Sequence, residues 1–427
     1  MCKNAFAIKG DIVWSKTPQE LATMEGGYLV SEDGICQGVF SELPERYAGV
    51  PVDDRSGMLV VPGLVDIHLH APQYAFRGLG MDLELLDWLN THTFPEEAKY
   101  RDLSYAERAY DIFASDLLHS ATTRAVIFAT LHVEATELLM DKLEATGLCT
   151  MVGKVNMDRN GSADLCEESA ASSLAETRQW LADVEKKGYE RTQAILTPRF
   201  TPSCSDDLMR GIGELRAEYG LPLQSHLSEN LSEIGWVKEL CPWSSCYGET
   251  YEKAGQLAGD APAIMAHCNW CPDEEMEILK ANHVTIAHCP QSNMMLSSGI
   301  APIRRYLDEG ISVGIGTDVA GGATLSMFRA IGDAVGVSKL RWRLVDDKLA
   351  PLSVAEAFYL ATAGGGSVFG QVGTFKEGYE LDAVVLDDAK LRTPRDLSLA
   401  ERLERFVYLS GEGGQVAGKY VAGRRVL

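Results

Sequence analysis

Two histidines, His68 and His70, stand two residues apart at the end of a short apolar stretch and give the clearest indication of chemistry in this chain. In a β-strand, side chains at i and i+2 leave the same face about 6.6 Å apart along the backbone, so two imidazoles can converge on one metal ion. A Pro-Gly pair before the stretch and an Ala-Pro pair after it favour a buried strand that runs into an exit loop, where ligand-binding residues are common. A pair of surface histidines is the alternative interpretation.

A metal site needs three or four protein ligands, and other residues stand at equivalent places. His226, His267, His288 and Asp318 each follow a short apolar run, at the carboxyl end of a candidate strand. The remaining four histidines lack such a context or lie at a strand start, so we interpret them as structural or surface residues. These four are His92, His119, His132 and His283.

The elements that would position these ligands alternate in type from residue 58 onward. Amphipathic stretches with apolar residues three and four apart predict helices at 104–120, 173–188, 204–220 and 273–282. Between such stretches lie eight candidate strands, at 63–70, 124–129, 149–156, 193–199, 222–227, 263–267, 284–288 and 312–316. Alternating strands and helices predict an α/β fold with a closed (β/α)8 TIM-type barrel at 61–371, in which catalytic groups lie at the carboxyl ends of the strands.

The two ends of the chain have a different pattern. Residues 1–60 and 372–427 contain short β-like segments, among them RFVYLS, separated by Gly, Asp and Pro. Since neither end is long enough for a stable sheet domain, we expect both to meet in one small, discontinuous β-sandwich domain beside the barrel. The glycines at 364–366 have no Lys-Ser/Thr after them, as a phosphate loop would require, and we interpret them as a helix terminator.

Composition limits the classes of function. A chain of 427 residues with 46% hydrophobic content can bury a large core. No apolar stretch of about 18 residues occurs and the N-terminus does not resemble a secretory signal, so we expect no membrane span and a cytoplasmic enzyme. The net charge of −22, from 61 acidic and 39 basic residues, repels phosphate backbones and argues against nucleic acid as a partner.

Ten cysteines are too few for a disulfide scaffold of this length, and we expect reduced thiols. Cys241 and Cys246 with Cys268 and Cys271 leave open a four-thiolate zinc site, although such sites usually belong to small modules with little other core. Redox use of Cys268 and Cys271 is a further alternative, but no thioredoxin-like βαβ context surrounds the pair.

With strand-end ligands at His68, His70, His226 and Asp318, the chain resembles the amidohydrolase superfamily of metal-dependent hydrolases over nearly its whole length. Within that superfamily, seven strings in order are similar to the guanine deaminase family: PGLVDIHLHAPQY, TFPEE, TPRF, HLSEN, AHC, HCPQSN and GTDVAGG. The resemblance implies hydrolysis of guanine to xanthine and ammonia by a metal-activated water, and a homodimer. Arg124 and the segment 241–246 look less typical of the family.

Three neutral imidazoles and one carboxylate leave a divalent ion with an open position, where the pKa of a bound water can fall from about 15.7 to about 7. This donor set suits zinc, one ion per subunit, although iron or manganese fits the same ligands. Glu229, three residues after His226, is near enough to move a proton from the water to a departing amine, and the resemblance implies this role. The alternative for Glu229 is a helix-start carboxylate beside a cap.

The resemblance also implies that Asp318 orients the attacking hydroxide, and that His267 hydrogen-bonds the hydroxide or the substrate rather than ligating the metal. Family members with two metals usually carry a carboxylated lysine at the end of the fourth strand. Here Arg199 ends that strand, which favours one metal, and Lys154 on the third strand is the residue that keeps two metals open.

For the substrate, the resemblance places Gln73, Arg199 and Phe200 around the base, together with His226 and Asp318 at the metal. Arginine only donates hydrogen bonds, so a buried Arg199 favours the six-position carbonyl of guanine over the amino group of adenine. Gln73 offers donors and an acceptor, and Phe200 can stack on the ring. A surface ion pair is the alternative for Arg199.

Three further residues are expected near the substrate on weaker grounds. Ser292 and Asn293, beyond the seventh strand, would also line the pocket. Trp88 would belong either to a lid or to a helix packed on the barrel.

Two other functions remain open from the sequence. The first is a related aminohydrolase that acts on a triazine, a pterin or another purine with the same metal site. The second is a non-catalytic scaffold on the same fold, which the presence of His68, His70, His226, Asp318 and Glu229 argues against.

Overall fold

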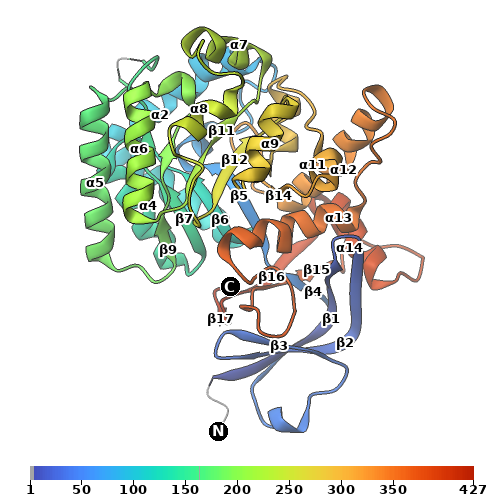
Figure 1. Ribbon diagram of the computed structural model, residues 1–427. Helices are drawn as coiled ribbons and strands as arrows, with labels where there is room; N and C mark the ends of the chain where they lie inside the picture. The colour runs from blue at the N-terminus through green and yellow to red at the C-terminus, as the bar shows by residue number, and fades with distance from the viewer. Residues whose placement is uncertain (1–3, 163) are drawn as a thin grey trace.

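The computed structural model describes residues 4–162 and 164–427, and most of its parallel strands belong to two four-stranded sheets (Figure 1). One sheet pairs β5 (Leu64–His70), β6 (Thr122–Phe128), β7 (Cys149–Gly153) and β9 (Thr192–Ala194). The other pairs β11 (Leu223–Leu227), β12 (Ala263–His267), β13 (Thr285–His288) and β14 (Ser312–Ile315). Each predicted strand between 63 and 316 therefore contributes to a parallel sheet.

The two parallel sheets meet along two seams of backbone hydrogen bonds. At one seam Leu196 bridges Leu223 in parallel fashion, and the Gln224 amide donates to the Leu196 carbonyl at 2.9 Å. At the other, the Asp318 amide donates to the His68 carbonyl at 2.8 Å. The exits of β14 and β5, which carry predicted ligands, are thereby held side by side.

The predicted third and fourth strands are each interrupted. The third stops at Gly153 and resumes as β8 (Val155–Asn156), and the fourth resumes as β10 (Thr197–Pro198). β8 and β10 pair in parallel with each other, Thr197 opposite Val155. The residue after β10, Arg199, continues this pairing, since its amide donates to the Asn156 carbonyl at 3.1 Å.

Helices follow most of these strands, and those predicted at 104–120, 173–188, 204–220 and 273–282 are confirmed. Their amphipathic faces pack against the strands because isolated helices of this length gain most of their stability from burial of one apolar face. The helices of the parallel-sheet region are α1 (Leu85–Trp88), α2 (Phe94–Glu97), α3 (Leu103–His119), α4 (Val133–Thr146), α5 (Ala170–Lys187), α6 (Asp206–Tyr219), α7 (Leu231–Leu240), α8 (Tyr247–Lys253), α9 (Asp273–Ala281), α10 (Pro290–Met295), α11 (Ile303–Asp308), α12 (Met327–Leu344) and α13 (Val354–Tyr359).

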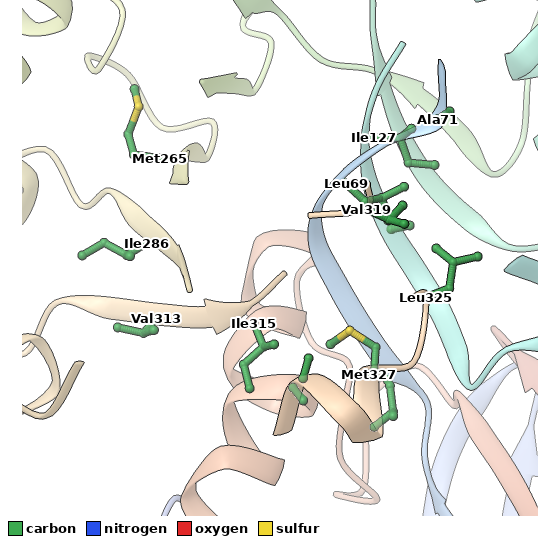
Figure 2. Close-up of a cluster of buried hydrophobic side chains, with 14 of the residues drawn as sticks. Leu69, Ala71, Ile127, Met265, Ile286, Val313, Ile315, Val319, Leu325 and Met327 are labelled. Atoms are coloured by element: carbon green, nitrogen blue, oxygen red, sulfur yellow. The ribbon is translucent and has the colours of Figure 1, made fainter. Parts of the chain in front are cut away.

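Alternation along the strands divides their side chains between two cores. Met265, Ile286 and Ile315 join the large core shared with the helices, part of which is drawn in Figure 2. Their neighbours in sequence, such as Ile264 and Ala287, belong instead to a smaller core that also contains residues of β5, β6 and β7. Side chains from both parallel sheets thus share this smaller core.

Both ends of the chain enter one seven-stranded sheet, in the order β17-β16-β15-β4-β1-β2-β3 (Figure 1). β4 pairs in parallel with β1 from the N-terminal end and antiparallel with β15 from the C-terminal end, as predicted for two ends that meet. The strands are β1 (Ala5–Thr17), β2 (Glu20–Glu32), β3 (Ile35–Phe40), β4 (Val52–Pro62), β15 (Ala383–Asp387), β16 (Gln415–Val421) and β17 (Arg424–Arg425).

The β assignment of RFVYLS at 405–410 was wrong, because this segment ends helix α14 (Leu399–Leu409). Ser398 caps the helix in a capping box with Glu401. Leu403, Phe406 and Val407 fall three or four residues apart and are buried on one face. That spacing is helical, but it is recognisable only over a segment longer than the six residues of RFVYLS.

The glycines at 364–366 do not terminate a helix either. The helical path continues from α13 through a π-helical turn (Leu360–Gly364), and Gly365 still has right-handed helical dihedral angles. These glycines permit close contact with strands, since a Cβ on Gly314 of β14 would lie only 2.7 Å from the Gly365 Cα. Small size rather than chain reversal explains the residue type here.

The cysteine alternatives gain no support. Cys241, Cys246, Cys268 and Cys271 are free thiols, and within 4–162 and 164–427 none of them belongs to a cluster able to hold a metal. In that same part of the chain, no helix combines the length and apolar character needed to cross a bilayer.

Candidate active site

The four predicted metal ligands converge where β5, β11 and β14 end. The Nε2 atoms of His68 and His70 lie 3.2 and 3.3 Å from the same carboxylate oxygen of Asp318. The Nε2 atom of His226 lies 3.2 Å from that of His70. Ligand atoms from three distant stretches of sequence therefore share one small volume, as the spacing of the histidines predicts.

The donor set fits a divalent cation. The Nδ1 of His226 contacts the Arg199 carbonyl oxygen at 2.6 Å and must donate to it, which leaves the Nε2 lone pair facing the Nε2 of His70. Two imidazole nitrogens at 3.2 Å are favourable neighbours when a cation or a proton lies between them. His68 is fully buried, its Nε2 contacts Asp318, and its Nδ1 has no hydrogen-bond partner among the described residues.

Electrostatics keep the ligands in the forms that bind metal. Burial lowers the pKa of His68, lowers that of His70 to about 4, and holds that of His226 well below its usual range, so all three imidazoles are neutral. Burial raises the pKa of Asp318, yet hydrogen bonds from the rings of His68 and His70 oppose this effect, and the pKa of this carboxyl lies well below its ordinary value. Neutral imidazoles and an ionised carboxylate are the required metal-binding states.

The backbone at the strand ends bends to aim these side chains. Asp318 has φ of +48° and His267 has φ of +73°, both in the left-handed region that few residues other than glycine adopt. Gly316 leaves room for the first ligand, since a Cβ there would lie 2.8 Å from the His68 Cβ. Buried Asp66 accepts from the amides of Thr317 and His68 at 3.0 and 3.4 Å, which fixes the exits of β5 and β14 relative to each other.

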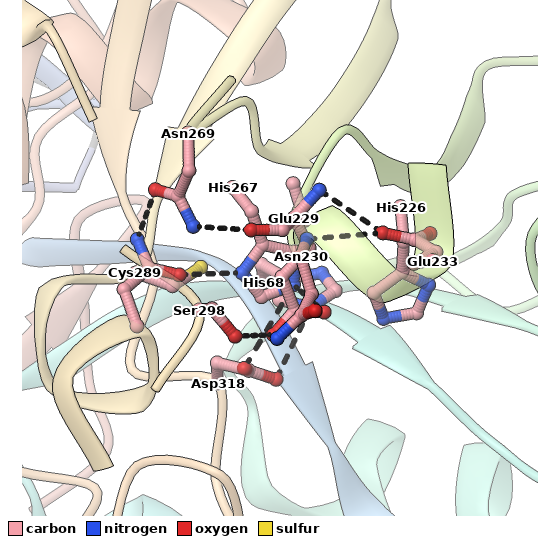
Figure 3. A network of polar contacts seen from close by, with 12 residues as sticks. His68, His226, Glu229, Asn230, Glu233, His267, Asn269, Cys289, Ser298 and Asp318 are labelled. Atoms are coloured by element: carbon pink, nitrogen blue, oxygen red, sulfur yellow. Dashed lines mark hydrogen bonds and ion pairs between the residues drawn. The ribbon is translucent and has the colours of Figure 1, made fainter. Parts of the chain in front are cut away.

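Glu229 reaches this cluster from the loop after β11. Its Oε2 lies 3.4 Å from the His267 Nε2, and its Oε1 accepts from the Ser298 hydroxyl at 2.8 Å (Figure 3). Burial, followed by the nearby charge of Asp318, raises the pKa of Glu229 to about 8. A carboxyl that titrates near neutrality can both take and return a proton.

The interpretation of Glu229 as a cap neighbour does not account for its side chain. The N-cap of α7 is Asn230, which forms a capping box with Glu233. Glu233 accepts from the Glu229 amide at 3.0 Å and from the Tyr247 hydroxyl at 2.8 Å, so it satisfies the helix start and leaves the Glu229 carboxylate free for the site.

Two asparagines orient His267 and the loop of Glu229. Asn293 donates from Nδ2 to the Asn269 Oδ1 at 2.8 Å, so its own Oδ1 accepts from the His267 Nδ1 at 3.0 Å. The Nε2 of His267 then carries the lone pair that faces Glu229 and Asp318. Asn269 also donates to the Glu229 carbonyl oxygen at 2.9 Å, a contact included in Figure 3. Sequence reasoning missed Asn269 and Ser298, whose strings carry no distinctive spacing.

The structure gives Asn293 and Ser292 places other than those expected. Neither lines the cavity beside the metal ligands. Asn293 instead accepts a hydrogen bond from the His267 Nδ1. Ser292 lies against Gly321, where an added Cβ would be 2.8 Å from the Ser292 hydroxyl oxygen. Asn293 thus supports the site through His267, whereas Ser292 packs against Gly321.

The cavity beside the ligands has about 430 Å³ of empty space, including its open mouth. Gln73, Arg199 and Phe200 line it as predicted, and Trp88 of α1 lines it too. Three further apolar lining residues were not identified from the sequence, namely Leu85, Leu89 and Leu296. Glu233 also reaches the cavity wall.

Arg199 is not a surface ion pair, since it is 3% exposed and its partner is the equally buried Glu97 of α2. The two terminal nitrogens of Arg199 donate to the two Glu97 oxygens at 2.5 and 3.1 Å. Glu97 also accepts from the Gln73 Nε2 at 2.8 Å. The sequence contained this residue in the TFPEE string, but nothing in the string assigned it a partner.

Other singled-out residues lie apart from the cluster. Lys154 is buried in an ion pair with Glu167 and donates to the Val155 carbonyl at 3.2 Å, and it belongs to neither group of potential metal ligands. His288 is buried and does not line the cavity. The second group of potential ligands instead joins Cys289 to His68, His267 and Asp318.

Comparison with known proteins agrees with this geometry. Residues 59–426 match the model of the amidohydrolase family. The guanine deaminase of Dictyostelium discoideum is 37% identical over 88% of this chain and 84% of its own length, and that of Escherichia coli is 34% identical over 96% and 94%.

A solved structure is similar over the whole molecule. The guanine deaminase of C. acetobutylicum, crystallised with guanine in its active site, superposes with a TM-score of 0.95 and 45% identity, over 99% of this chain and 100% of that one. The match covers the strands that carry the ligands as well as the sheet of both termini. The chain therefore belongs to the guanine deaminases of the amidohydrolase family.

Proposed function

We propose that the protein hydrolyses guanine to xanthine and ammonia. The observation that carries this proposal is the position of the buried Glu229 carboxylate, 3.4 Å from the His267 Nε2 and beside the convergent ligand cluster, in a cavity whose other wall presents Arg199 and Gln73. A proton-transfer group and a set of recognition groups therefore face the same small volume.

The ligand cluster would hold one divalent cation through His68, His70, His226 and Asp318. When bound, such a cation supplies a Lewis acid that makes water acidic enough to attack near neutral pH. We infer zinc, because three imidazoles and a carboxylate suit it, and iron or manganese would fit the same donors. Metal analysis of the purified protein tests this identity.

The protein's own residues would handle the protons. Glu229 takes one proton from the attacking water as the water oxygen bonds to carbon two, and delivers that proton to ring nitrogen three. It then moves the remaining water proton to the exocyclic nitrogen as the bond from carbon two to that nitrogen breaks, which leaves xanthine and ammonia. The lone pair on the His267 Nε2, which faces both Glu229 and Asp318, would accept a hydrogen bond from the water, and Asp318 would orient the water. Asn293 holds the His267 tautomer that this role requires.

Recognition of the base would come from Gln73, Arg199 and Phe200. Arg199 presents only donors, which suits a carbonyl oxygen and not an amino group at the six position. Phe200 is 5% exposed and lines the cavity, where its ring can pack against a flat heterocycle.

For the architecture, we propose that the two parallel sheets form one closed (β/α)8 barrel over 61–371. Hydrogen bonds at both seams and a shared inner core support closure. We also propose that 1–60 and 372–427 form a sandwich-like domain, because Val60 and Val385 pack in a core separate from that of their strand neighbours Leu59 and Leu386. Limited proteolysis at the 60 and 372 boundaries tests this division.

A homodimer in the cytoplasm is the assembly and location that the family resemblance implies, and we retain both as proposals. Sedimentation velocity of the metal-loaded protein tests the first. Fractionation of the source cells tests the second.

The activity itself is tested by ammonia release from a panel of guanine, adenine, cytosine, a pterin and an aminotriazine. We expect turnover of guanine and none of adenine or cytosine. Faster turnover of the pterin or the triazine would replace guanine with the related heterocycle, and bound metal without any ammonia release would favour a non-catalytic scaffold.

A further inference from the structure

Glu97 is a buried carboxylate that neither the metal site nor the proton path uses. It is 1% exposed, lies at the end of α2, and does not line the cavity. Both residues that it contacts through side-chain hydrogen bonds, Gln73 and Arg199, do line the cavity. Its place behind these two recognition residues suggests a role in aiming them.

We propose that Glu97 is a positioning residue that sets the substrate specificity of the site by fixing Arg199 and Gln73 together. The inference rests on the proposed function, since it concerns how the same cavity recognises a carbonyl-bearing purine. Glu97 itself would not touch the base.

The contact with Arg199 fixes the direction of the guanidinium. Both terminal nitrogens donate to the two oxygens of Glu97, at 2.5 and 3.1 Å, in a two-pronged pair that allows only one orientation of the plane. The Phe94 ring, 5.1 Å from the guanidinium carbon, contacts the same group from its face. A guanidinium has five N–H donors, so Arg199 keeps further donors beyond the two that contact Glu97, and it lines the cavity.

The contact with Gln73 fixes which way its amide points. A carboxylate can only accept, so the nitrogen of the amide must face Glu97, at 2.8 Å. The amide oxygen then faces the backbone N–H of Ala320, which donates to it at 3.5 Å beside the ligand Asp318. A second lone pair on this oxygen stays available for an N–H group of the base.

One carboxylate thus orients a donor group and an acceptor group in the same wall. A purine with a carbonyl at position six and a proton on the adjacent ring nitrogen matches this pair of groups. A purine without that carbonyl gains little from it. Discrimination of this kind depends on buried polar groups that the wrong ligand leaves unpaired.

The test compares Glu97→Gln and Glu97→Asp with the parent and with Glu96→Gln, all loaded with zinc. Glu96 is the neighbouring carboxylate, pairs with Lys99, and contacts neither recognition residue, so its variant is the matched control. The measurements are KM and kcat for guanine, zinc content, thermal unfolding, and the dissociation constants of hypoxanthine and unsubstituted purine. Hypoxanthine has the six-position carbonyl and lacks the amine that would leave.

We expect both Glu97 variants to raise KM for guanine and the hypoxanthine dissociation constant by about 30-fold, the effect of about one hydrogen bond to a charged group. We expect kcat and zinc content to stay near the parent values and purine binding to be unchanged. Glu97→Asp keeps the charge, so it tests the geometry even if Glu97→Gln unfolds.

Unchanged KM and hypoxanthine binding in both variants would overturn the inference. A loss of kcat or zinc with KM unchanged would overturn it too, because that result assigns Glu97 to general structure. Failure of the parent to release ammonia from guanine would instead overturn the proposed function, and hypoxanthine binding would still report on Glu97.

Discussion

The two walls of the cavity are built by different means. The wall of metal ligands comes from the carboxyl ends of β5, β11 and β14. These strands belong to two parallel sheets, and backbone contacts where the sheets meet, such as that of the Asp318 amide with the His68 carbonyl, help to bring His68, His226 and Asp318 together. The recognition wall depends on Arg199 and on Glu97, a residue 102 positions away on a short helix. The metal ligands thus lie at the most regular part of the fold. The residues that recognise the substrate depend instead on a contact between irregular segments.

Because the two walls are built differently, we expect substitutions in one wall to affect turnover and substitutions in the other to affect affinity for the base. Changes at the strand ends should remove turnover and leave affinity for a non-reactive base. Changes at the Arg199–Glu97 pair should remove affinity and leave metal content. The following experiments test this separation, from the largest expected effect to the smallest.

Removal of the metal should abolish turnover, because the neutral imidazoles cannot activate water by themselves. It should also lower thermal stability, since a ligand present at about 1,000 times its dissociation constant stabilises the folded state by about 4 kcal/mol. Ammonia release and thermal unfolding before and after chelation measure both effects. Zinc should restore activity and magnesium should not. Full activity at less than about one zinc per ten chains would contradict the metal assignment.

Glu229→Gln should lower kcat by about 10²- to 10⁴-fold with zinc still bound, because the amide cannot carry a proton. Steady-state ammonia assays with parallel metal analysis measure this. Asn269→Ala is a useful companion. Asn269 contacts Glu229 through its backbone carbonyl and not through its carboxylate, so the effect should be smaller. A fully active Glu229→Gln variant would show that another group moves the proton.

Arg199→Ala should raise KM for guanine by roughly 100-fold. It should also destabilise the fold by about 3–5 kcal/mol, because Glu97 would be left buried without its partner. The double variant Arg199→Ala with Glu97→Gln should recover part of that stability and none of the affinity. Chemical denaturation and KM measurements separate the two effects. Loss of zinc from Arg199→Ala would mean that the walls are not independent.

Ser298→Ala should have the smallest effect, of a few-fold in kcat/KM at neutral pH. Glu229 must be ionised to accept the first proton, so kcat/KM should rise with pH as this carboxyl loses its proton. Burial raises the pKa of Glu229 to about 8, the Ser298 hydrogen bond lowers it, and a bound cation would lower it further. Loss of the hydrogen bond should therefore move the rising limb to higher pH. If the rising limb of kcat/KM stayed at the parental pH, Ser298 would have no influence on the pKa of Glu229.

Much of the catalytic wall could be predicted from the sequence. His68 and His70 follow an apolar strand at a spacing of two, and Asp318 follows a glycine-containing one. Such patterns are local, and parallel strands bring their carboxyl ends to one edge. Family resemblance supplied the roles of Glu229 and His267, which spacing left open.

The flanks and linking segments were less predictable for the same physical reason. RFVYLS has apolar residues that suit a strand in a short window, and only the cap at Ser398 and packing over the full length of α14 make it a helix. The glycines at 364–366 serve close contact between a helical turn and two strands, a requirement that arises only once those elements are packed.

The sequence by itself determined the ligand types, the strands that carry them and the meeting of the two chain ends, because side-chain periodicity is a local property of the backbone. The tertiary structure alone decided that Arg199 points where Glu97 holds it, that Asn293 supports His267 instead of lining the cavity, and that Lys154 is engaged by Glu167. These outcomes depend on contacts between segments far apart in the chain, and the direction of a buried polar side chain is set by the partner that satisfies it.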